Sequence, residues 1–363
     1  MSKEKSKFYS LKNILSKNAT YNIIIGERSN GKTYGILKYA LEKYIRGDGQ
    51  LAIVRRWKED ITGRRASDIF SSFNADGTIP KLTNGEYEGI HYWAGKFYLC
   101  TYDENHKPLY NDNDCFAYCF SLSETEHNKS ISYPNITTIF FDEFLTKRLY
   151  LADEFVLFMN TVSTIVRQRD NVQIFMAGNT VNKFCPYFAE MGLKHIQKME
   201  QGSIDVYTYG DSQLKVAVEY CSSISKQKKS NFYFAFDNPK LQMITGGKWE
   251  LDIYPHIPCK YNRNQILFEF VIEFDDNVFL GEVINLGNGD IILYYHEKTT
   301  PIKEGTIVFS LAESTSMCYN RSIYKSNFTG GKKIVWLMEH GKTFYQNNDV
   351  GNTINNYLKC CRG

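Results

Sequence analysis

The feature that most constrains the fold is an eight-residue segment near the amino terminus, Gly26-Glu-Arg-Ser-Asn-Gly-Lys-Thr33. It matches the pattern GxxxxGK[ST], in which glycines let backbone N–H groups turn inward around phosphates. An apolar run at 22–25 precedes the segment and a helical pattern over 32–45 follows it, which is the context that this pattern requires. The sequence therefore predicts a phosphate-binding loop (P-loop) between a strand and a helix.

Each position of this loop has an expected role. Lys32 would reach the β- and γ-phosphates of ATP, and the hydroxyl group of Thr33 would bind Mg²⁺. The amino end of the following helix adds partial positive charge where the phosphates lie. Arg28 is an addition to the pattern, and it could contact a phosphate, contact a neighbouring subunit or face solvent. The residues expected to bind the nucleotide are Gly26, Glu27, Arg28, Ser29, Asn30, Gly31, Lys32 and Thr33.

A second apolar run, 137–141, ends in two adjacent carboxylates, Asp142 and Glu143. Behind a P-loop, Asp142 would hold the water shell of Mg²⁺, and Glu143 would orient and polarise the attacking water. This pair is typical of ring-forming and translocating ATPases, whose sheet has an extra strand between the loop strand and the acidic strand. The run 172–177 is predicted to be that strand. Asn179, which follows it, is either a sensor of the γ-phosphate or a local cap.

Two arginines, Arg167 and Arg169, follow an amphipathic helix that we predict over 152–166. In ring-forming ATPases an arginine near this place reaches the neighbouring subunit's site and stabilises the charge of the transition state. Cations also stabilise the carboxyl ends of helices, so a purely local role is the alternative. Of the two, we interpret Arg167 as the better candidate for the catalytic role.

The length of the chain, 363 residues, suits two domains. Apolar strands alternate with helices in the first part, which predicts a parallel sheet covered on both faces and hence an α/β fold for a P-loop ATPase domain over 1–210. Within it, 64–122 is predicted to be a β-rich insertion and 204–207 a fifth buried strand. Residues 211–250 are predicted to be a linker, and 251–363 a smaller α+β domain with a β-meander and a helical end.

Charge and composition restrict the partners only weakly. The net charge of +3 gives no general sign of nucleic-acid binding, although basic residues gather locally, and any one such group is more often a solvated face. The nine cysteines lack zinc-site spacing and no apolar run is long enough to span a membrane, so we expect a cytosolic protein with reduced thiols and no membrane contact. The candidate DNA-contacting residues are Arg55, Arg56, Lys58, Lys226, Lys228 and Lys229.

Together these residues resemble the φ29-type DNA packaging ATPases, the encapsidation proteins of small tailed phages. The resemblance covers most of residues 5–210, and its segments occur in the family's order. They are GERSNGKT at 26–33, IVRRWK at 53–58, KSISYPN at 129–135, TTIFFDEF at 137–144, VRQR at 166–169, and GN at 178–179 followed by PYF at 186–188.

The resemblance implies an ATP-driven motor that moves double-stranded phage DNA into a preformed capsid, with ATP and Mg²⁺ as cofactors. It makes Arg167 the arginine that acts on the neighbouring subunit and Lys129 a second basic residue at that interface. The other catalytic candidates are Glu143, Lys32 and Asn179. The resemblance also implies a homopentameric ring on the capsid portal, present in the host cytoplasm and absent from the mature virion. Some relatives bind a packaging RNA, and the sequence leaves open whether this chain does.

The second domain of this family resembles an RNase H-like nuclease that has lost its metal-binding acids. Here the strands within 268–284 carry that part of the resemblance. Glu269, Glu273, Asp275 and Glu282 do not form a recognisable set of metal ligands, since alternating acids on strands usually mark a solvent-facing side. We therefore expect a vestigial nuclease domain without nuclease activity.

Three other functions fit parts of the sequence. A nucleotide or small-molecule kinase would share the P-loop, but such kinases rarely carry the Asp–Glu pair and need an arginine-rich lid that we do not recognise here. A helicase, a replication factor or a filamentous-phage assembly motor would share the same core. An ATP-binding structural subunit of a virion would bind the nucleotide without turning it over.

Overall fold

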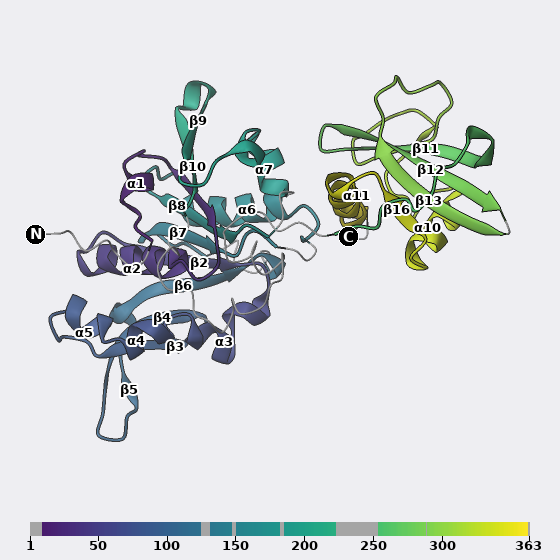
Figure 1. The fold of residues 1–363 in the computed structure, drawn as a ribbon. Helices are drawn as coiled ribbons and strands as arrows, with labels where there is room; N and C mark the ends of the chain where they lie inside the picture. Colours follow the sequence, from purple (N-terminus) through teal and green to yellow (C-terminus); the bar gives the residue numbers. More distant parts are fainter. Residues whose placement is uncertain are drawn as a thin grey trace, which may run out of the picture. The chain divides into compact units, whose positions relative to one another are not determined.

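The structure, a computed structural model, forms two compact units, of which the second consists mainly of residues 250–363. Figure 1 shows the first unit in purple to teal and the second in green and yellow. No helix among the described residues is long and apolar enough to cross a membrane. The structure describes residues 9–124, 131–146, 150–181, 185–222, 253–287 and 289–361.

The first unit is built on one large sheet. Its strands are β1 (Tyr21–Gly26), β2 (Gln50–Arg55), β3 (Gly89–Trp93), β4 (Lys96–Tyr102), β5 (Pro108–Leu109), β6 (Cys115–Ser121), β7 (Ile136–Asp142), β8 (Gln173–Asn179), β9 (Ile204–Tyr209) and β10 (Leu214–Tyr220). They lie in the order β3-β4-β6-β2-β7-β8-β1-β10-β9, with β5 paired to β4. From β6 to β10 in this order each strand is parallel to the next, whereas β3 and β4 at one edge and β9 at the other pair antiparallel.

Strand β8 lies between β1 and β7, as the sequence predicted for the run 172–177. In the register of these strands, Gly26 lies opposite Asn179, and Asp142 lies opposite Ala177. Parallel strands end at the same edge of a sheet, and this edge is where ligands of open α/β folds bind. The strand order therefore brings the P-loop, the acidic pair and Asn179 together.

Helices cover both faces of the sheet. The helices of the first unit are α1 (Lys12–Leu15), α2 (Lys32–Ile45), α3 (Gly63–Asp68), α4 (Ser71–Ala75), α5 (Thr78–Leu82), α6 (Glu154–Val166) and α7 (Pro186–Glu190), with short 3₁₀ turns η1 (Lys58–Ile61), η2 (Asp112–Asp114), η4 (Ile196–Lys198) and η5 (Gly210–Ser212). Helix α2 has the predicted bounds, and its apolar side packs in one cluster with Phe140 of β7. The next residue, Phe141, points to the other face, where it contacts Phe158 of α6 and Tyr187 of α7.

The segment 64–122 differs from the predicted β-rich insertion. Its first part is helical, because Ala66, Phe70, Phe73 and Ile79 supply apolar side chains that α3 to α5 bury in the same cluster as α2. Its strands are also not a separate layer. Strand β6 pairs in parallel with β2, so β3, β4 and β6 extend the main sheet.

Two predictions at the opposite edge were wrong in part. The run 204–207 belongs to β9, an antiparallel edge strand without a fully buried residue, and is not a fifth buried strand. The predicted linker begins too early, because Leu214–Tyr220 forms strand β10, which pairs in parallel with β1. Polar residues such as Lys215 and Glu219 interrupt the apolar pattern of this strand and hide it in the sequence. Residues 223–250 of the predicted linker lie outside the described residues.

The second unit has a smaller, mixed sheet. Its strands are β11 (Ile266–Phe274), β12 (Asn277–Gly287), β13 (Asp290–Glu297), β14 (Val308–Ser310), β15 (Tyr319–Asn320) and β16 (Thr343–Tyr345), in the order β15-β14-β11-β12-β13-β16, with the 3₁₀ turn η6 (Arg263–Gln265) and helices α10 (Gly331–Glu339) and α11 (Asn348–Cys361). The antiparallel meander β11–β12–β13 and the helical end are as predicted. The short parallel strands and α10 were not recognised in the sequence.

Candidate functional site

The P-loop holds its lysine by contacts within the loop. The turn between β1 and α2 uses positive φ angles at Ser29 (58°) and Gly31 (89°). The Lys32 Nζ atom donates to the carbonyl oxygen of Glu27 at 2.6 Å and to Asn30 Oδ1 at 3.2 Å. Burial lowers the pKa of Lys32 to about 8, because the ammonium group is less well solvated there than on a surface lysine. The loop therefore presents a buried cation.

Asn179 lies beside this lysine. It is the last residue of β8, and its Oδ1 atom accepts a hydrogen bond from Lys32 Nζ at 3.3 Å. The two residues are 147 positions apart in the chain, and only the placement of β8 next to β1 brings them together. Asn179 therefore lies beside the lysine that the sequence analysis expects to bind the β- and γ-phosphates.

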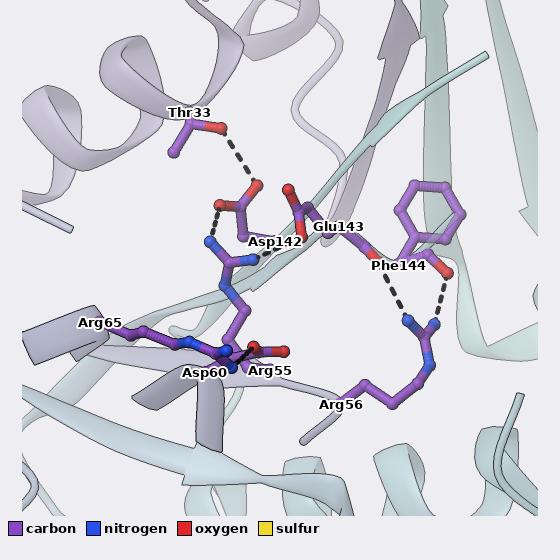
Figure 2. Close-up of polar contacts among 8 residues, drawn as sticks. All are labelled: Thr33, Arg55, Arg56, Asp60, Arg65, Asp142, Glu143 and Phe144. Atoms are coloured by element: carbon purple, nitrogen blue, oxygen red, sulfur yellow. Dashed lines mark hydrogen bonds and ion pairs between the residues drawn. The ribbon is translucent and has the colours of Figure 1, made fainter. Parts of the chain in front are cut away.

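The strand-end acids form one connected group with the loop and with β2 (Figure 2). Thr33 Oγ1 donates to Asp142 Oδ1 at 3.1 Å. Arg55, the last residue of β2, donates from Nη2 to Asp142 Oδ2 at 2.7 Å and from Nη1 to Glu143 Oε2 at 2.8 Å. One guanidinium group therefore bridges both carboxylates.

The two acids differ in how far their side chains are buried. The Asp142 side chain is 7% exposed, whereas that of Glu143 is 65% exposed. Burial raises the pKa of the Asp142 carboxyl, and the adjacent Arg55 guanidinium acts in the opposite direction. The hydroxyl of Thr33 and the carboxylate of Asp142 are oxygen donors of the kind that Mg²⁺ prefers, and Mg²⁺ usually takes its other ligands from phosphates and water. These two residues therefore fit a nucleotide-bound Mg²⁺ ion.

The structure corrects two candidate DNA contacts. Arg55 belongs to the acidic group, and Arg56 is only 6% exposed and pairs with Glu154 at 2.7 Å. A buried, paired guanidinium group is unavailable to an external phosphate. Lys58 is different, because it lies at the surface with Glu124 at 2.9 Å as its partner. Lys226, Lys228, Lys229 and the interface candidate Lys129 lie outside the described residues.

The two arginines after α6 have different surroundings. Arg169 donates to the backbone oxygens of Tyr133, Pro134 and Ile136, around the start of β7, and to that of Ile165 in α6. Arg167 is exposed and donates to one carbonyl oxygen, that of Ile131, at 3.1 Å. It also has a positive φ of 51°, which is unusual for a residue with a side chain. Arg169 therefore has a structural role, and Arg167 is the arginine available to a second molecule.

The acids singled out in the second unit are not gathered around one point. Glu282 is buried, accepts a hydrogen bond from the hydroxyl of Tyr261, and lies 3.6 Å from His296 Nε2. Glu269 lies opposite Glu282 on β11 and is exposed. Among the residues that the structure describes, no group of three or more His, Cys, Asp or Glu side chains is placed to hold a metal ion.

The fold and the site define a mixed α/β protein whose large, mostly parallel sheet carries a P-loop and an acidic strand end at one edge. The family model described as Podovirus DNA encapsidation protein (Gp16) matches residues 3–82 and 101–233, more than half of the chain. The chain belongs to this family.

Two curated relatives each match about half of the chain. The DNA packaging protein of Bacillus phage phi29 is 27% identical over 190 residues (51% of this chain), and that of Bacillus phage B103 is 28% identical over 185 residues (50% of this chain). Each match covers 50% of the relative, so the chain spans about half the length of the curated relatives it matches.

Two solved structures share the fold over nearly the whole chain. One is the bacteriophage Phi-29 viral genome packaging motor assembly, with a TM-score of 0.59 and 21% identity over 98% of this chain and 100% of that chain. The other is the Phi-28 gp11 DNA packaging motor, with a TM-score of 0.56 and 18% identity over 99% of both chains.

Proposed function

We propose that this chain is the ATPase of a phage packaging motor, which uses ATP hydrolysis to move double-stranded DNA into a preformed capsid. The observation that carries the proposal is the connected group of Thr33, Asp142, Arg55 and Glu143 beside the buried Lys32. It combines a phosphate-binding cation, donors for a metal ion and an exposed carboxylate at one sheet edge. Membership of the encapsidation family supports DNA as the load.

The proposed chemistry assigns one task to each side chain. Lys32 binds the β- and γ-phosphates, and Asn179 contacts the γ-phosphate from the adjacent strand. Thr33 and Asp142 would hold Mg²⁺, and this ion would neutralise charge on the phosphates. Glu143 is the exposed acid, and it orients and polarises the attacking water. The position of β8 between β1 and β7 supports an ATPase of the ASCE type, the P-loop class with an additional strand and a catalytic glutamate. In this class water accepts the γ-phosphoryl group.

The proposed assembly is a homopentameric ring on the capsid portal. Arg167 is the residue that we assign to the neighbouring subunit's site, since it is exposed whereas Arg169 is held by backbone oxygens. Lys129 is assigned to the same interface. The ring would act in the host cytoplasm and leave the portal before the virion matures, and a packaging RNA remains an optional partner.

For the second unit we propose an RNase H-like fold without nuclease activity. Its support is the antiparallel meander β11–β12–β13 flanked by shorter parallel strands, together with helices α10 and α11. The buried Glu282 is engaged by Tyr261 and His296, which leaves it poorly placed to bind a metal ion. Cleavage of plasmid DNA with Mn²⁺ that disappears in Glu269→Gln and Glu282→Gln variants would contradict this proposal.

The test of the proposed function is ATP turnover by the purified chain, with and without double-stranded DNA and empty capsids. We expect turnover that rises with both, together with DNA that becomes nuclease-resistant inside the capsids. Glu143→Gln is the matched control, because it keeps the shape of the side chain and removes its charge. Turnover that is indifferent to capsids but accompanied by unwinding of DNA would instead indicate a helicase. ATP binding without any turnover would indicate a structural subunit.

A further inference from the structure

The residue that follows β2, Arg56, is a buried arginine whose three nitrogens all have acceptors. Its Nε and Nη2 atoms donate to the two carboxylate oxygens of Glu154, at 2.7 and 2.8 Å. Nη2 also donates to the carbonyl oxygen of Phe144 at 2.8 Å, and Nη1 donates to that of Glu143 at 3.3 Å. Figure 2 shows the guanidinium group facing these two carbonyl groups. Arg56 therefore binds the carbonyl groups of two consecutive peptide units, those that follow Glu143 and Phe144.

The carboxylate that pairs with Arg56 is itself fully engaged. The side chain of Glu154 is 0% exposed, and it also accepts hydrogen bonds from the hydroxyl of Tyr187 at 2.9 Å and from the backbone N–H of Leu151 at 2.8 Å. Each of its oxygens thus accepts two hydrogen bonds. A buried polar network in which every member is satisfied is rigid. This network joins the end of β2, the turn after β7, and helices α6 and α7.

The turn that Arg56 grips has an unfavourable backbone conformation. Glu143 has a φ of 59°, in the left-handed region, which residues with a side chain occupy only when their surroundings impose it. Phe144, the next residue, is fully buried, and its N–H group donates to Ala177 on β8. The direction in which Glu143 leaves the strand is therefore set by this turn, whereas its side chain is mostly exposed.

We propose that Arg56 is a positioning residue for Glu143, which holds the left-handed turn and so aims the carboxylate at the nucleotide site. The inference rests on the proposed function, in which Glu143 orients the attacking water. Arg56 acts through the backbone and does not contact the nucleotide. Because Glu154 is the first residue of α6, and Arg167 follows the last, the same contacts also fix the helix that leads to Arg167.

The alternative is a buried ion pair that only stabilises the first unit. The two roles differ in what they predict for folded molecules. Loss of a purely structural pair lowers the fraction of folded protein but leaves the turnover number of each folded molecule unchanged. Loss of a positioning contact lowers the turnover number at saturating ATP while nucleotide affinity is retained, because misplacement of a reacting group by about 1 Å can cost about a hundredfold in rate.

The experiment compares two variants of the full chain with a matched control. Arg56→Lys removes the forked contacts, and Tyr187→Phe removes one hydroxyl group from the network without changing its packing. The control is Tyr39→Phe, whose lost hydroxyl donates to Gln173 at 2.7 Å outside the network. The measurements are kcat and KM for ATP, affinity for a fluorescent ATP analogue, and folded fraction by circular dichroism. We expect kcat to fall roughly 10- to 100-fold in Arg56→Lys and less in Tyr187→Phe, with affinity nearly unchanged.

A second comparison ties the effect to Glu143. In single-turnover reactions followed over hours, Arg56→Lys should add little to the loss already caused by Glu143→Gln, since both changes remove the same action. The inference would be contradicted if Arg56→Lys lowered the rate as much in the Glu143→Gln background as it does in the wild-type chain. It would also be contradicted if Arg56→Lys and Tyr187→Phe both had the wild-type kcat per folded molecule. If Arg56→Lys does not fold, the test is the kcat of Tyr187→Phe relative to that of Tyr39→Phe. A lower kcat in Tyr187→Phe supports the positioning role, and an equal kcat contradicts it. Absence of turnover in the wild-type chain would instead contradict the proposed function itself, and this inference with it.

Discussion

Replacement of Arg56 by methionine should destabilise the first unit by an amount that follows from the burial of its partner. Methionine retains most of the apolar volume but leaves the Glu154 carboxylate, 0% exposed, without a counter-charge. Removing one partner of a buried ion pair typically costs about 3–5 kcal/mol. The remaining donors, Tyr187 and the N–H of Leu151, keep the carboxylate partly satisfied, so we expect the lower end of this range, about 3 kcal/mol.

This loss is measurable by urea or thermal denaturation of the first unit, followed by circular dichroism. For a unit of this size about 3 kcal/mol corresponds to a fall in Tm of roughly 6–12 °C. The double variant Arg56→Met/Glu154→Leu should regain at least half of the lost stability, because an apolar pair can replace a buried ion pair at little net cost. A loss below about 1 kcal/mol in Arg56→Met, or a double variant less stable than the single one, would refute this reasoning.

Four further predictions concern the nucleotide site and the DNA. Glu143→Gln should retain ATP binding and lower phosphate release by roughly 10²–10⁴-fold, and equal turnover would contradict its assigned role. Arg167→Ala should be inactive alone but recover turnover when mixed with a Lys32→Ala variant, because each subunit supplies what the other lacks; failure of every mixture would argue against action between subunits. Burial lowers the pKa of Lys32 to about 8, so its ammonium form is lost as the pH rises through that value. Affinity for ATP should therefore weaken between pH 7.5 and 9.5. The Lys32→Arg variant stays charged, so its affinity for ATP should depend less on pH. Affinity for double-stranded DNA should fall steeply with salt, and Lys58→Ala should reduce the slope of that dependence by about 1 if Lys58 contacts a phosphate.

Several parts of the fold could be predicted because neighbouring residues in the chain encode them. The strand at 22–25, the P-loop and the helix Lys32–Ile45 follow one another without a break, so local pattern was enough. The place of β8 was predicted from the chemistry of the acidic pair, since that pair is typical of sheets with an inserted strand. The structure confirms this order. Segments with mixed patterns were predicted less well, notably the helices at 63–82 and the strand Leu214–Tyr220.

The sequence by itself determined which residues we propose for nucleotide binding, because the P-loop and the Asp142–Glu143 pair are each contiguous in the chain. What Arg55 and Arg56 do was decided only by the tertiary structure. They are adjacent in the chain, yet one bridges Asp142 and Glu143 and the other pairs with Glu154, 98 residues away. Successive side chains at a strand end diverge, and the partner of each depends on which strand and helix pack beside it. That arrangement depends on the burial of the whole sheet, which no local pattern records.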